Sequence, residues 1–390
     1  MPRQKNHRRR ALSLSSGRAM ETETFVGLDV HRKSVVATAI DGDGRPIAQK
    51  KMGPVDSELT EFLDSLPGSK HVALEACSMW EHYFDAARVS GADVVLSNPL
   101  KTRLIAEATI KTDKVDSEAL ATLLRLHSLP TVYTPTSELR ALRLLVRDRV
   151  FFSRKVHDLQ NHIYYFLLRR GIQYEDGVLR HRRRREVLRE LRLPEVDRSL
   201  DALDHLQETV KSLERELHQA FLATPEAQLL ASVPGIGELT AVGLVAFLCP
   251  IERFSNIDQL SSYAGLAPTT YQSADRRYQG HLKRDSNGLV RWLLIEASWT
   301  HRQRARSSDV ARVGRRIGRR CGASRGAVAA AHKLLKIIFA ILKERRPYLP
   351  HAPERTTAMQ QLQGPSRVAA VKRVRRAALG SSAADCLSAH

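Results

Sequence analysis

Phe25-Val26-Gly27-Leu28-Asp29-Val30 is a short apolar run with one acidic residue set into it. An apolar run of this length between polar residues is typical of a buried β-strand. A carboxylate inside such a strand is costly unless something binds it. The run therefore predicts both the first strand of a sheet and a binding role for Asp29.

The segments that follow predict a mixed sheet. Residues 34–40 are expected to form a second strand, and Asp41-Gly42-Asp43-Gly44 a hairpin turn in which both aspartates serve the turn. The expected elements after it are a strand at 46–52, a helix at 56–66, strands at 71–75 and 93–96, a helix at 80–89 between them, and helix from Leu100 onward. A strand meander followed by strand–helix alternation indicates an α/β domain over residues 22–135, and its order of elements resembles the RNase H-like fold.

Three further acids accompany Asp29. Glu75 closes another apolar strand, and Asp113 and Asp116 stand three residues apart near the start of a predicted helix, so they share one face of it. Two-metal phosphodiester chemistry needs several carboxylates at one point, because divalent ions take hard oxygen ligands. The order Asp, Glu, Asp-x-x-Asp predicts such a metal site. Taken alone, Asp113 is equally explained as an N-cap and Asp116 as a surface acid.

The charge balance favours a polyanionic partner. The chain has 62 Lys and Arg against 42 Asp and Glu, a formal net charge of +20. Neutralising phosphates releases counterions, so nucleic acid is favoured over an acidic membrane, and a solvated basic surface is the plain alternative. No apolar run reaches the roughly 18 residues that a membrane span needs.

The cysteines and the two ends of the chain carry weaker signals. Cys77, Cys249, Cys321 and Cys386 lie far apart without a CxxC, which argues against a zinc site and a disulfide framework and fits a reducing cytoplasm. Residues 1–21 are expected to be a disordered basic extension, with the functional protein beginning near Met20. Residues 351–390 are expected to be a disordered basic tail.

Residues 136–224 are predicted to form a helical, coiled-coil-like stalk. Its apolar seam consists of Leu200, Leu203, Leu206, Val210, Leu213, Leu217 and Phe221. Steps of three or four residues are typical of helix–helix packing, and the segment 139–168 is the expected partner. An oligomer contact and an intrachain hairpin explain this seam equally well. Between the helices, the run at 181–185 is too basic to be buried, and Arg182, Arg183, Arg184 and Arg185 are expected either to contact phosphates or to form a solvated charge run.

Residues 225–350 are predicted to be mostly helical and to begin with a glycine hairpin. Residues 232–241 predict helix, tight turn, helix, and the turn resembles a helix-hairpin-helix motif. Gly235 and Gly237 would then present backbone N–H groups to a DNA phosphate. A plain interhelical turn is the alternative. A dinucleotide loop is disfavoured because Thr240 stands where a glycine is needed.

A polar loop is expected between Tyr271 and Asn287, leading into a helix at 288–301 capped by Asp285 or Ser286. The basic residues around it, which are candidate nucleic-acid contacts, are Arg276, Arg277, Lys283 and Arg284. Judged from spacing alone, a lone serine in such a loop is most often structural.

Three segments together resemble the DEDD transposases of insertion sequences: Gly27-Leu28-Asp29-Val30-His31, Leu74-Glu75 and Lys111-Thr112-Asp113-Lys114-Val115-Asp116. The catalytic domain of that family is similar to Holliday-junction resolvases of the RuvC type. The resemblance implies that Asp29, Glu75, Asp113 and Asp116 bind a pair of Mg²⁺ ions.

The same family has a C-terminal domain in which a reactive serine follows a Gly-Leu-x-Pro segment. Here Gly265-Leu266-Ala267-Pro268 precedes Ser273, so the resemblance implies Ser273 as the nucleophile, with Ser286 as the fallback. The family usually has glycines after this serine, whereas this chain has Ala274-Asp275. The implied chemistry is attack on a DNA phosphate through a covalent phosphoserine, by a homodimer or homotetramer guided by a structured RNA.

The resulting interpretation is an RNase H-like domain, a helical stalk and a helical serine-bearing domain that together act as an insertion-sequence transposase or recombinase. Two other classes stay open. A structure-selective nuclease would use the four acids with water as nucleophile, so that Ser273→Ala would still cleave. A non-catalytic nucleic-acid-binding protein would bind without any dependence on divalent metal.

Overall fold

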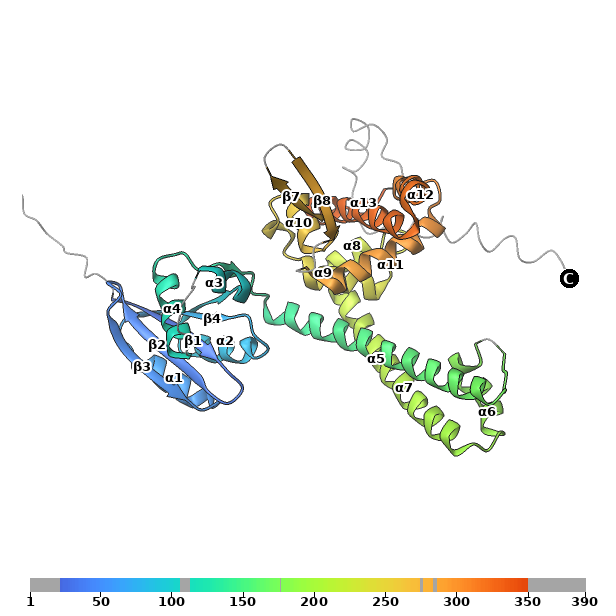
Figure 1. The fold of residues 1–390 in the computed structure, drawn as a ribbon, viewed down its shortest axis with the longest axis horizontal. Helices are drawn as coiled ribbons and strands as arrows, with labels where there is room; N and C mark the ends of the chain where they lie inside the picture. The colour runs from blue at the N-terminus through green and yellow to red at the C-terminus, as the bar shows by residue number, and fades with distance from the viewer. Residues whose placement is uncertain (1–21, 106–112, 176, 274–275, 283–285, 350–390) are drawn as a thin grey trace, which may run out of the picture. The chain divides into compact units, whose positions relative to one another are not determined.

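The computed structural model describes residues 22–105, 113–175, 177–273, 276–282 and 286–349. The chain separates into two compact units at the Pro135–Thr136 bond (Figure 1). Each unit has its own apolar core. The predicted terminal extensions, 1–21 and 351–390, lie outside the described residues, as do Lys283 and Arg284.

The first unit is built on one mixed sheet. Its strands are β1 (Glu23–Val30), β2 (Val35–Asp41), β3 (Pro46–Met52), β4 (Ser69–Glu75), β5 (Asp93–Ser97) and β6 (Thr131–Val132). Across the described residues they lie in the order β3-β2-β1-β4-β5-β6. β1 runs antiparallel to β2 and parallel to β4, and β4 runs parallel to β5. The predicted meander and the mixed sheet are confirmed, and the short edge strand β6 is an addition.

Helices cover both faces of this sheet. They are α1 (Asp56–Asp64), α2 (Trp80–Val89), α3 (Pro99–Ile105) and α4 (Asp113–Arg125). α1 and α2 pack on one face, where Leu59 and Tyr83 join Leu28 in the core. α4 packs on the opposite face, where Leu120 meets Ala73. β1 is therefore buried on both sides, which explains why its sequence is almost continuously apolar.

A long helical hairpin opens the second unit. Its helices are α5 (Ser137–Arg169), α6 (Arg182–Arg189) and α7 (Pro194–Ala223), with a 3₁₀ turn at Val178–Arg180. Figure 1 shows α5 and α7 side by side, with α6 at the far end of the pair. Ile163, late in α5, packs with Leu200, early in α7, whereas Val146 and Leu217 share a core at the other end. The two helices are therefore antiparallel.

This hairpin accounts for the apolar seam of α7 within one chain. Leu200, Leu203 and Leu217 are buried at its two ends, and Leu206 and Val210 between them are only half-buried. The intrachain explanation thus needs no oligomer contact, and coiled-coil geometry stays a prediction.

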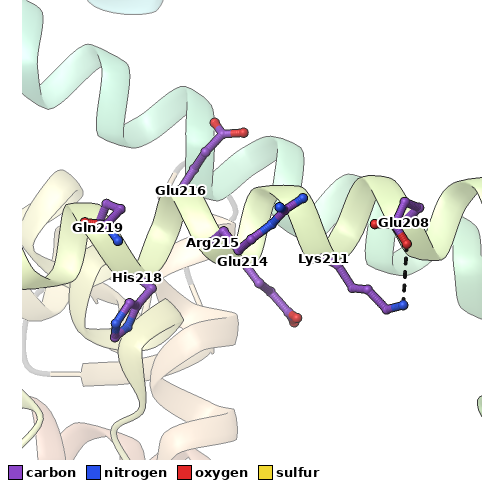
Figure 2. A pocket seen from close by; sticks show the side chains of 7 residues that line it. All are labelled: Glu208, Lys211, Glu214, Arg215, Glu216, His218 and Gln219. Carbon is purple, nitrogen blue, oxygen red and sulfur yellow. Dashed lines mark hydrogen bonds and ion pairs between the residues drawn. The ribbon is translucent and has the colours of Figure 1, made fainter.

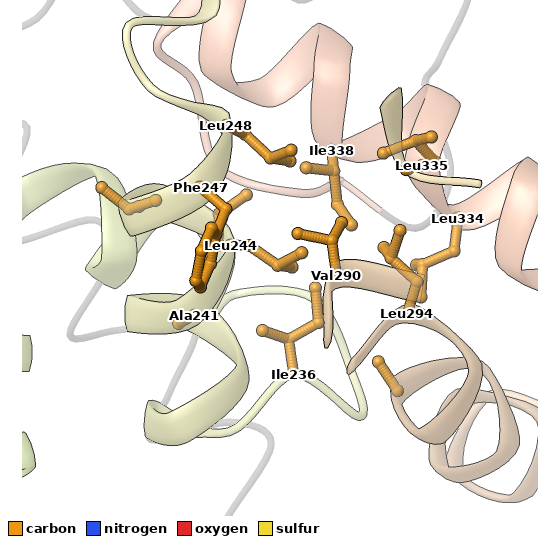
Figure 3. Packing of buried hydrophobic residues seen from close by; sticks show 14 of the residues in the cluster. Ile236, Ala241, Leu244, Phe247, Leu248, Val290, Leu294, Leu334, Leu335 and Ile338 are labelled. Atoms are coloured by element: carbon orange, nitrogen blue, oxygen red, sulfur yellow. The ribbon is translucent and has the colours of Figure 1, made fainter. Parts of the chain in front are cut away.

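The rest of the second unit is a helical bundle. Its elements are α8 (Pro225–Leu230), α9 (Glu238–Leu248), α10 (Ile257–Tyr263), α11 (Gly288–Arg304), α12 (Asp309–Cys321) and α13 (Ala323–Glu344), with a 3₁₀ turn at Ile251–Arg253 and the strands β7 (Pro268–Ser273) and β8 (Arg276–Leu282). Phe247 of α9, Leu294 of α11 and Ile338 of α13 meet in its core (Figure 3). Among the described helices, none is both long and apolar enough to cross a membrane.

Candidate active site

Asp29 and Glu75 stand side by side at the carboxyl ends of two parallel strands. The register pairs Leu28 of β1 with Leu74 of β4, so the next residue on each strand is an acid. Because side chains alternate between faces, both acids lie on the face that also carries Gly27, the face covered by α4. Asp29 is largely shielded, with 16% of its side chain exposed. The sequence-predicted pair is thus brought together by strand register.

α4 brings the other two acids toward the same end of β1. Its backbone crosses β1 at Gly27, where a Cβ atom would lie 1.9 Å from the carbonyl oxygen of Ser117. Phe25 packs against Ala121, one turn further along the helix. The end of β1 that carries Asp29 therefore lies toward the first turn of α4, which contains Asp113 and Asp116. The side chain of Asp113 lies outside the described residues.

Polar contacts hold α4 in this position. The buried Thr38 Oγ1 lies 2.7 Å from Ser117 Oγ, and Gln49 Nε2 donates to the same threonine oxygen at 2.8 Å. At the other end of the helix, Arg125 Nη1 donates to the carbonyl oxygen of Gly42 at 3.2 Å. Sequence reasoning missed these positioning residues, because the two contacts that α4 itself makes, Ser117 with Thr38 and Arg125 with Gly42, join positions 79 and 83 residues apart.

One histidine orients the first carboxylate. His31 Nε2 donates to Asp29 Oδ2 at 2.8 Å, and the His31 side chain is half-exposed. Asp41, by contrast, accepts from the backbone N–H groups of Asp43 and Arg45, at 2.9 and 2.8 Å. The prediction that Asp41 serves the turn is confirmed.

The donor chemistry of the four acids suits Mg²⁺, which prefers carboxylate oxygens. Both strand-end acids are partly shielded from water, and acids in the first turn of α4 also face a favourable helix dipole. Among the side chains that the structure describes, however, no three His, Cys, Asp or Glu lie close enough together to hold a metal ion. The backbone brings Asp29, Glu75 and the first turn of α4 to one edge, and the complete ligand set stays a prediction.

Ser273 ends a strand. The expected polar loop is wrong: β7 and β8 form a two-stranded antiparallel hairpin in which Ser273 pairs with Arg276 and Gln272 with Arg277. Residues 274–275, between the strands, lie outside the described residues. Ser273 and Arg276 are therefore the last described pair before the turn. Thr-Thr-Tyr at 269–271, with its high strand propensity, was the available signal.

Ser286 lies in a packed junction. A Cβ on Gly265, whose φ is +66°, would lie 2.4 Å from Ser286 Oγ, so this glycine makes room for the serine. Next to it, Asn287 caps α11 by accepting from the backbone N–H of Val290. The predicted cap at Asp285 or Ser286 is therefore wrong, and the cap lies one residue later than Ser286.

The glycine hairpin joins α8 to α9 as predicted, and its two glycines differ. Gly235 has φ +96°, and a Cβ there would lie 2.5 Å from the backbone nitrogen of His301. Backbone conformation and packing therefore explain this glycine without a bound phosphate. Gly237 is exposed, and nothing lies within 4 Å of its Cβ position. Glu238, which follows it, binds His218 at 3.1 Å and places a carboxylate at the start of α9. Phosphate binding by Gly235 and Gly237 stays a prediction.

His301 ties this hairpin to α12. Its Nδ1 donates to the carbonyl oxygen of Pro234 at 2.7 Å, and its Nε2 lies 3.0 Å from Ser308 Oγ. Ser308 in turn accepts from the backbone N–H of Ala311 and caps α12. Burial lowers the pKa of His301, and the bond to Pro234 opposes that shift.

The arginine run at the end of the stalk is only partly solvated. Arg182, Arg183 and Arg184 are exposed, but Arg185 is only 2% exposed. The expectation that this run is too basic to be buried is therefore wrong for Arg185. Its Nη2 lies 2.7 Å from Asp204 Oδ1 on α7, and this carboxylate supplies the countercharge. Burial lowers the pKa of Arg185, and Asp204 opposes that shift.

α7 also carries a surface depression of mixed charge (Figure 2). It is lined by Glu208, Lys211, Glu214, Arg215, Glu216, His218 and Gln219. All of them belong to this one helix, and Lys211 pairs with Glu208 at 3.5 Å. A surface formed by one helix, with three acids interspersed with two bases, has no converging groups for chemistry.

Two family models match the chain. One, for DEDD transposases of the IS110 type and described as "Transposase", matches residues 26–170. The other, described as "Transposase IS116/IS110/IS902 family", matches residues 227–313. The first match covers the strands and helix that carry the acids and implies an RNase H-like fold, in agreement with the mixed sheet. The second covers the hairpin that carries Ser273.

Curated relatives extend the likeness over most of the chain. A transposase for insertion sequence element IS1111A from Coxiella burnetii is 26% identical over 351 residues, covering 85% of this chain and 93% of the relative. A transposase for insertion sequence element IS1328 from Yersinia enterocolitica is 26% identical, covering 73% and 86%. A pilin gene-inverting protein from Moraxella lacunata is 25% identical, covering 65% and 74%. The chain belongs to the IS110/IS116/IS902 family of insertion-sequence transposases.

Proposed function

We propose that this transposase cuts and rejoins DNA with Ser273 as the nucleophile and with Asp29, Glu75, Asp113 and Asp116 as the metal ligands. The observation that carries the proposal is the register of β1 and β4, which places Asp29 beside Glu75 at the end that the first turn of α4 approaches. Acids at adjacent strand ends have no structural need of one another, because like charges repel. A cation bound by both carboxylates would offset this repulsion.

The serine step conserves the number of phosphodiester bonds. Ser273 Oγ loses its proton and attacks a DNA phosphorus, the bond from phosphorus to a deoxyribose oxygen breaks, and that oxygen takes up a proton. A hydroxyl end of another strand then attacks the phosphoserine and releases Ser273. Because the ester energy is stored in the enzyme–DNA bond, rejoining needs no external energy source.

The carboxylates would hold two Mg²⁺ ions, which stabilise negative charge developing on the phosphate and its leaving oxygen. Asp29 and Glu75 contribute ligand oxygens from the sheet, and Asp113 and Asp116 from α4. His31 keeps the Asp29 carboxylate in one orientation through its 2.8 Å hydrogen bond. An oriented carboxylate binds a cation with less loss of side-chain entropy.

The positions of the two serines in the chain favour Ser273 over Ser286. Ser286 Oγ is packed against the Gly265 turn, next to the residue that caps α11. Ser273 is the last residue of β7, at the end of a two-stranded hairpin. A nucleophile must approach a bulky DNA phosphate, and the end of a hairpin is better suited to that than a packed junction.

The proposed partners are the element's DNA ends, target DNA and a structured guide RNA, with the protein acting as a homodimer or homotetramer. The net charge of +20 supports a nucleic-acid partner. The choice of a guide RNA and of an oligomer rests on the family resemblance.

A covalent-trapping assay tests the proposal. Purified protein is incubated with its element's junction DNA, any cognate RNA and Mg²⁺, and then run on a denaturing gel. Wild type should give a protein–DNA adduct. Ser273→Ala should lower adduct yield at least about 1,000-fold, because the nucleophile is removed. Asp29→Asn should lower adduct yield by more than about 100-fold, because it changes a proposed metal ligand itself. Substituting a residue that only orients a metal ligand already costs about 10- to 100-fold.

Two matched variants serve as controls. Ser286→Ala and Asp43→Asn change the same residue types, in the packed junction and in the exposed turn, and both should keep the adduct. If the adduct survives in Ser273→Ala but disappears in Ser286→Ala, the nucleophile is Ser286 and not Ser273. Cleavage without any adduct, unchanged in Ser273→Ala, would replace the serine mechanism by water attack.

A further inference from the structure

One face of α12 carries five arginines and a single acid, Asp309, in the first turn of the helix. Arg312, Arg315, Arg316, Arg319 and Arg320 are all exposed, whereas Val310, Ala311 and Gly314 on the other side are buried. At 3.6 residues per turn, these five side chains fall within one arc opposite Gly314. They are called the α12 arginine face below.

Glycine packing fixes which way this face points. A Cβ on Gly326 of α13 would lie 2.6 Å from the carbonyl oxygen of Gly314 and 2.8 Å from Cα of Gly318. The backbones of α12 and α13 are therefore in direct contact along this side. Any rotation of α12 about its axis would replace a glycine by a side chain at that contact, so the arginines are held outward.

The charge of this face is almost uncompensated. Arg312 pairs with Asp309 at 2.8 Å. Within the described part of the chain, Arg315, Arg316, Arg319 and Arg320 make no ion pair with a carboxylate. Arginines at spacings of three and four residues repel one another along a helix. The helix dipole favours cations in the last turn, which accounts for Arg319 and Arg320 but not for Arg315 and Arg316.

We propose that the α12 arginine face binds the phosphate backbone of duplex DNA. The proposal rests on the proposed function only in taking DNA as the substrate. Guanidinium groups bind phosphates through paired hydrogen bonds, and Arg312 to Arg320 span about 12 Å along the helix. α12 contains no aromatic residue, so it lacks the stacking platform with which proteins hold single-stranded bases. The face therefore fits a duplex, whose bases are covered.

The salt dependence of binding tests this surface directly. Affinity of the full-length protein for a duplex of unrelated sequence is measured by fluorescence anisotropy over a range of salt concentrations. The logarithm of affinity falls with the logarithm of salt by about 0.9 for each phosphate contacted. The double variant Arg315→Gln/Arg319→Gln should therefore lower this slope by about 1.8 and weaken binding at moderate salt by about tenfold or more.

A charge-matched variant separates this face from net charge. Arg198→Gln/Arg215→Gln removes two exposed arginines of α7 that also form no ion pair with a carboxylate among the described residues, and it should change the slope by less than about 0.5. Equal changes in the two double variants, or an unchanged slope in Arg315→Gln/Arg319→Gln, would overturn the proposal. Circular dichroism of each variant checks that α12 is still folded.

Two further arms complete the test. If the Arg315→Gln/Arg319→Gln variant loses affinity for duplex RNA but not for duplex DNA, the face binds RNA and the proposal is wrong. Ser273→Ala, which cannot form an adduct under the proposed function, should keep the full salt slope. If wild type forms no adduct, the proposed chemistry fails while the slopes still decide the role of α12. If adducts form but the slopes do not differ, only the α12 proposal fails.

Discussion

Gly235 and Gly237 stand two residues apart in one turn, and their surroundings are opposite. Gly235 combines φ +96° with a Cβ position 2.5 Å from the backbone of α11, and Gly237 has φ −90° and open space around it. A motif match treats both as phosphate-binding glycines. Their environments assign packing to the first and leave only the second accessible to a phosphate.

Gly235→Ala should lower the free energy of unfolding by about 2 to 5 kcal/mol, because it adds both backbone strain and a clash that α11 cannot relieve by moving a side chain. Urea unfolding measures this. Gly237→Ala is the matched control and should change stability by less than about 1 kcal/mol. A small effect at Gly235 would show that α11 does not press against the turn.

His301 should make the second unit less stable in mild acid. Its folded-state pKa lies below the ordinary value of 6.5, chiefly through burial, so the unfolded chain binds the proton more readily. The corresponding stability is present above about pH 6.5 and is lost as the pH falls through the folded-state pKa. The loss of unfolding free energy between about pH 7.5 and about pH 5.5 should shrink in His301→Gln. His205→Gln, at an exposed position of α7, controls for the substitution itself.

The hairpin of α5 and α7 is closed at its far end by charge rather than by apolar packing alone. α6 presents Arg185 and Arg189 to α7, where Asp204 lies 2.7 Å from the first and 3.3 Å from the second. A buried arginine is tolerated only with its countercharge. The run of basic residues that looks like a nucleic-acid patch in the sequence is therefore partly a structural joint.

Asp204→Asn should destabilise this joint by about 3 kcal/mol or more, because it leaves Arg185 buried without a countercharge. Asp201→Asn is the control on the same helix: Asp201 binds Arg189 at 2.8 Å but is 71% exposed, and such pairs contribute about 1 kcal/mol or less. Hydrogen exchange of the α6 amides reports on both. Equal protection of α6 in Asp204→Asn and Asp201→Asn would contradict a buried joint.

Over the whole molecule, the sequence predicted best those elements whose signal is local. The strand containing Asp29 and the strand ending in Glu75 each carry an apolar run with an acid, and both are where they were expected. That the two acids are neighbours depends on strand register, which no local pattern contains.

The errors share a cause. The sequence predicts Arg185 at the surface, contacting phosphate or solvent, because its partner, Asp204, is 19 residues away on another helix. The sequence predicts a loop around Ser273 because residues 268–273 and 276–282 lack the apolar alternation of a sheet strand. The cap of α11 was misplaced by one residue because Asp285, Ser286 and Asn287 are all good capping residues, and only the chain path selects among them.

The contact between Gly27 and Ser117 fixes α4 against β1 at one point, so a displacement of one end of the helix would also displace the other end. With Ser117 as the pivot, the acid end at Asp113 lies about 6 Å away and the Arg125 end about 12 Å away. A shift of about 1 Å at the turn that holds Arg125 would therefore tilt the acids by about 0.5 Å, which is the tolerance of a preorganised site. The turn at Gly42 is remote from the proposed metal site, yet through Arg125 and α4 it would affect the position of two of the proposed ligands.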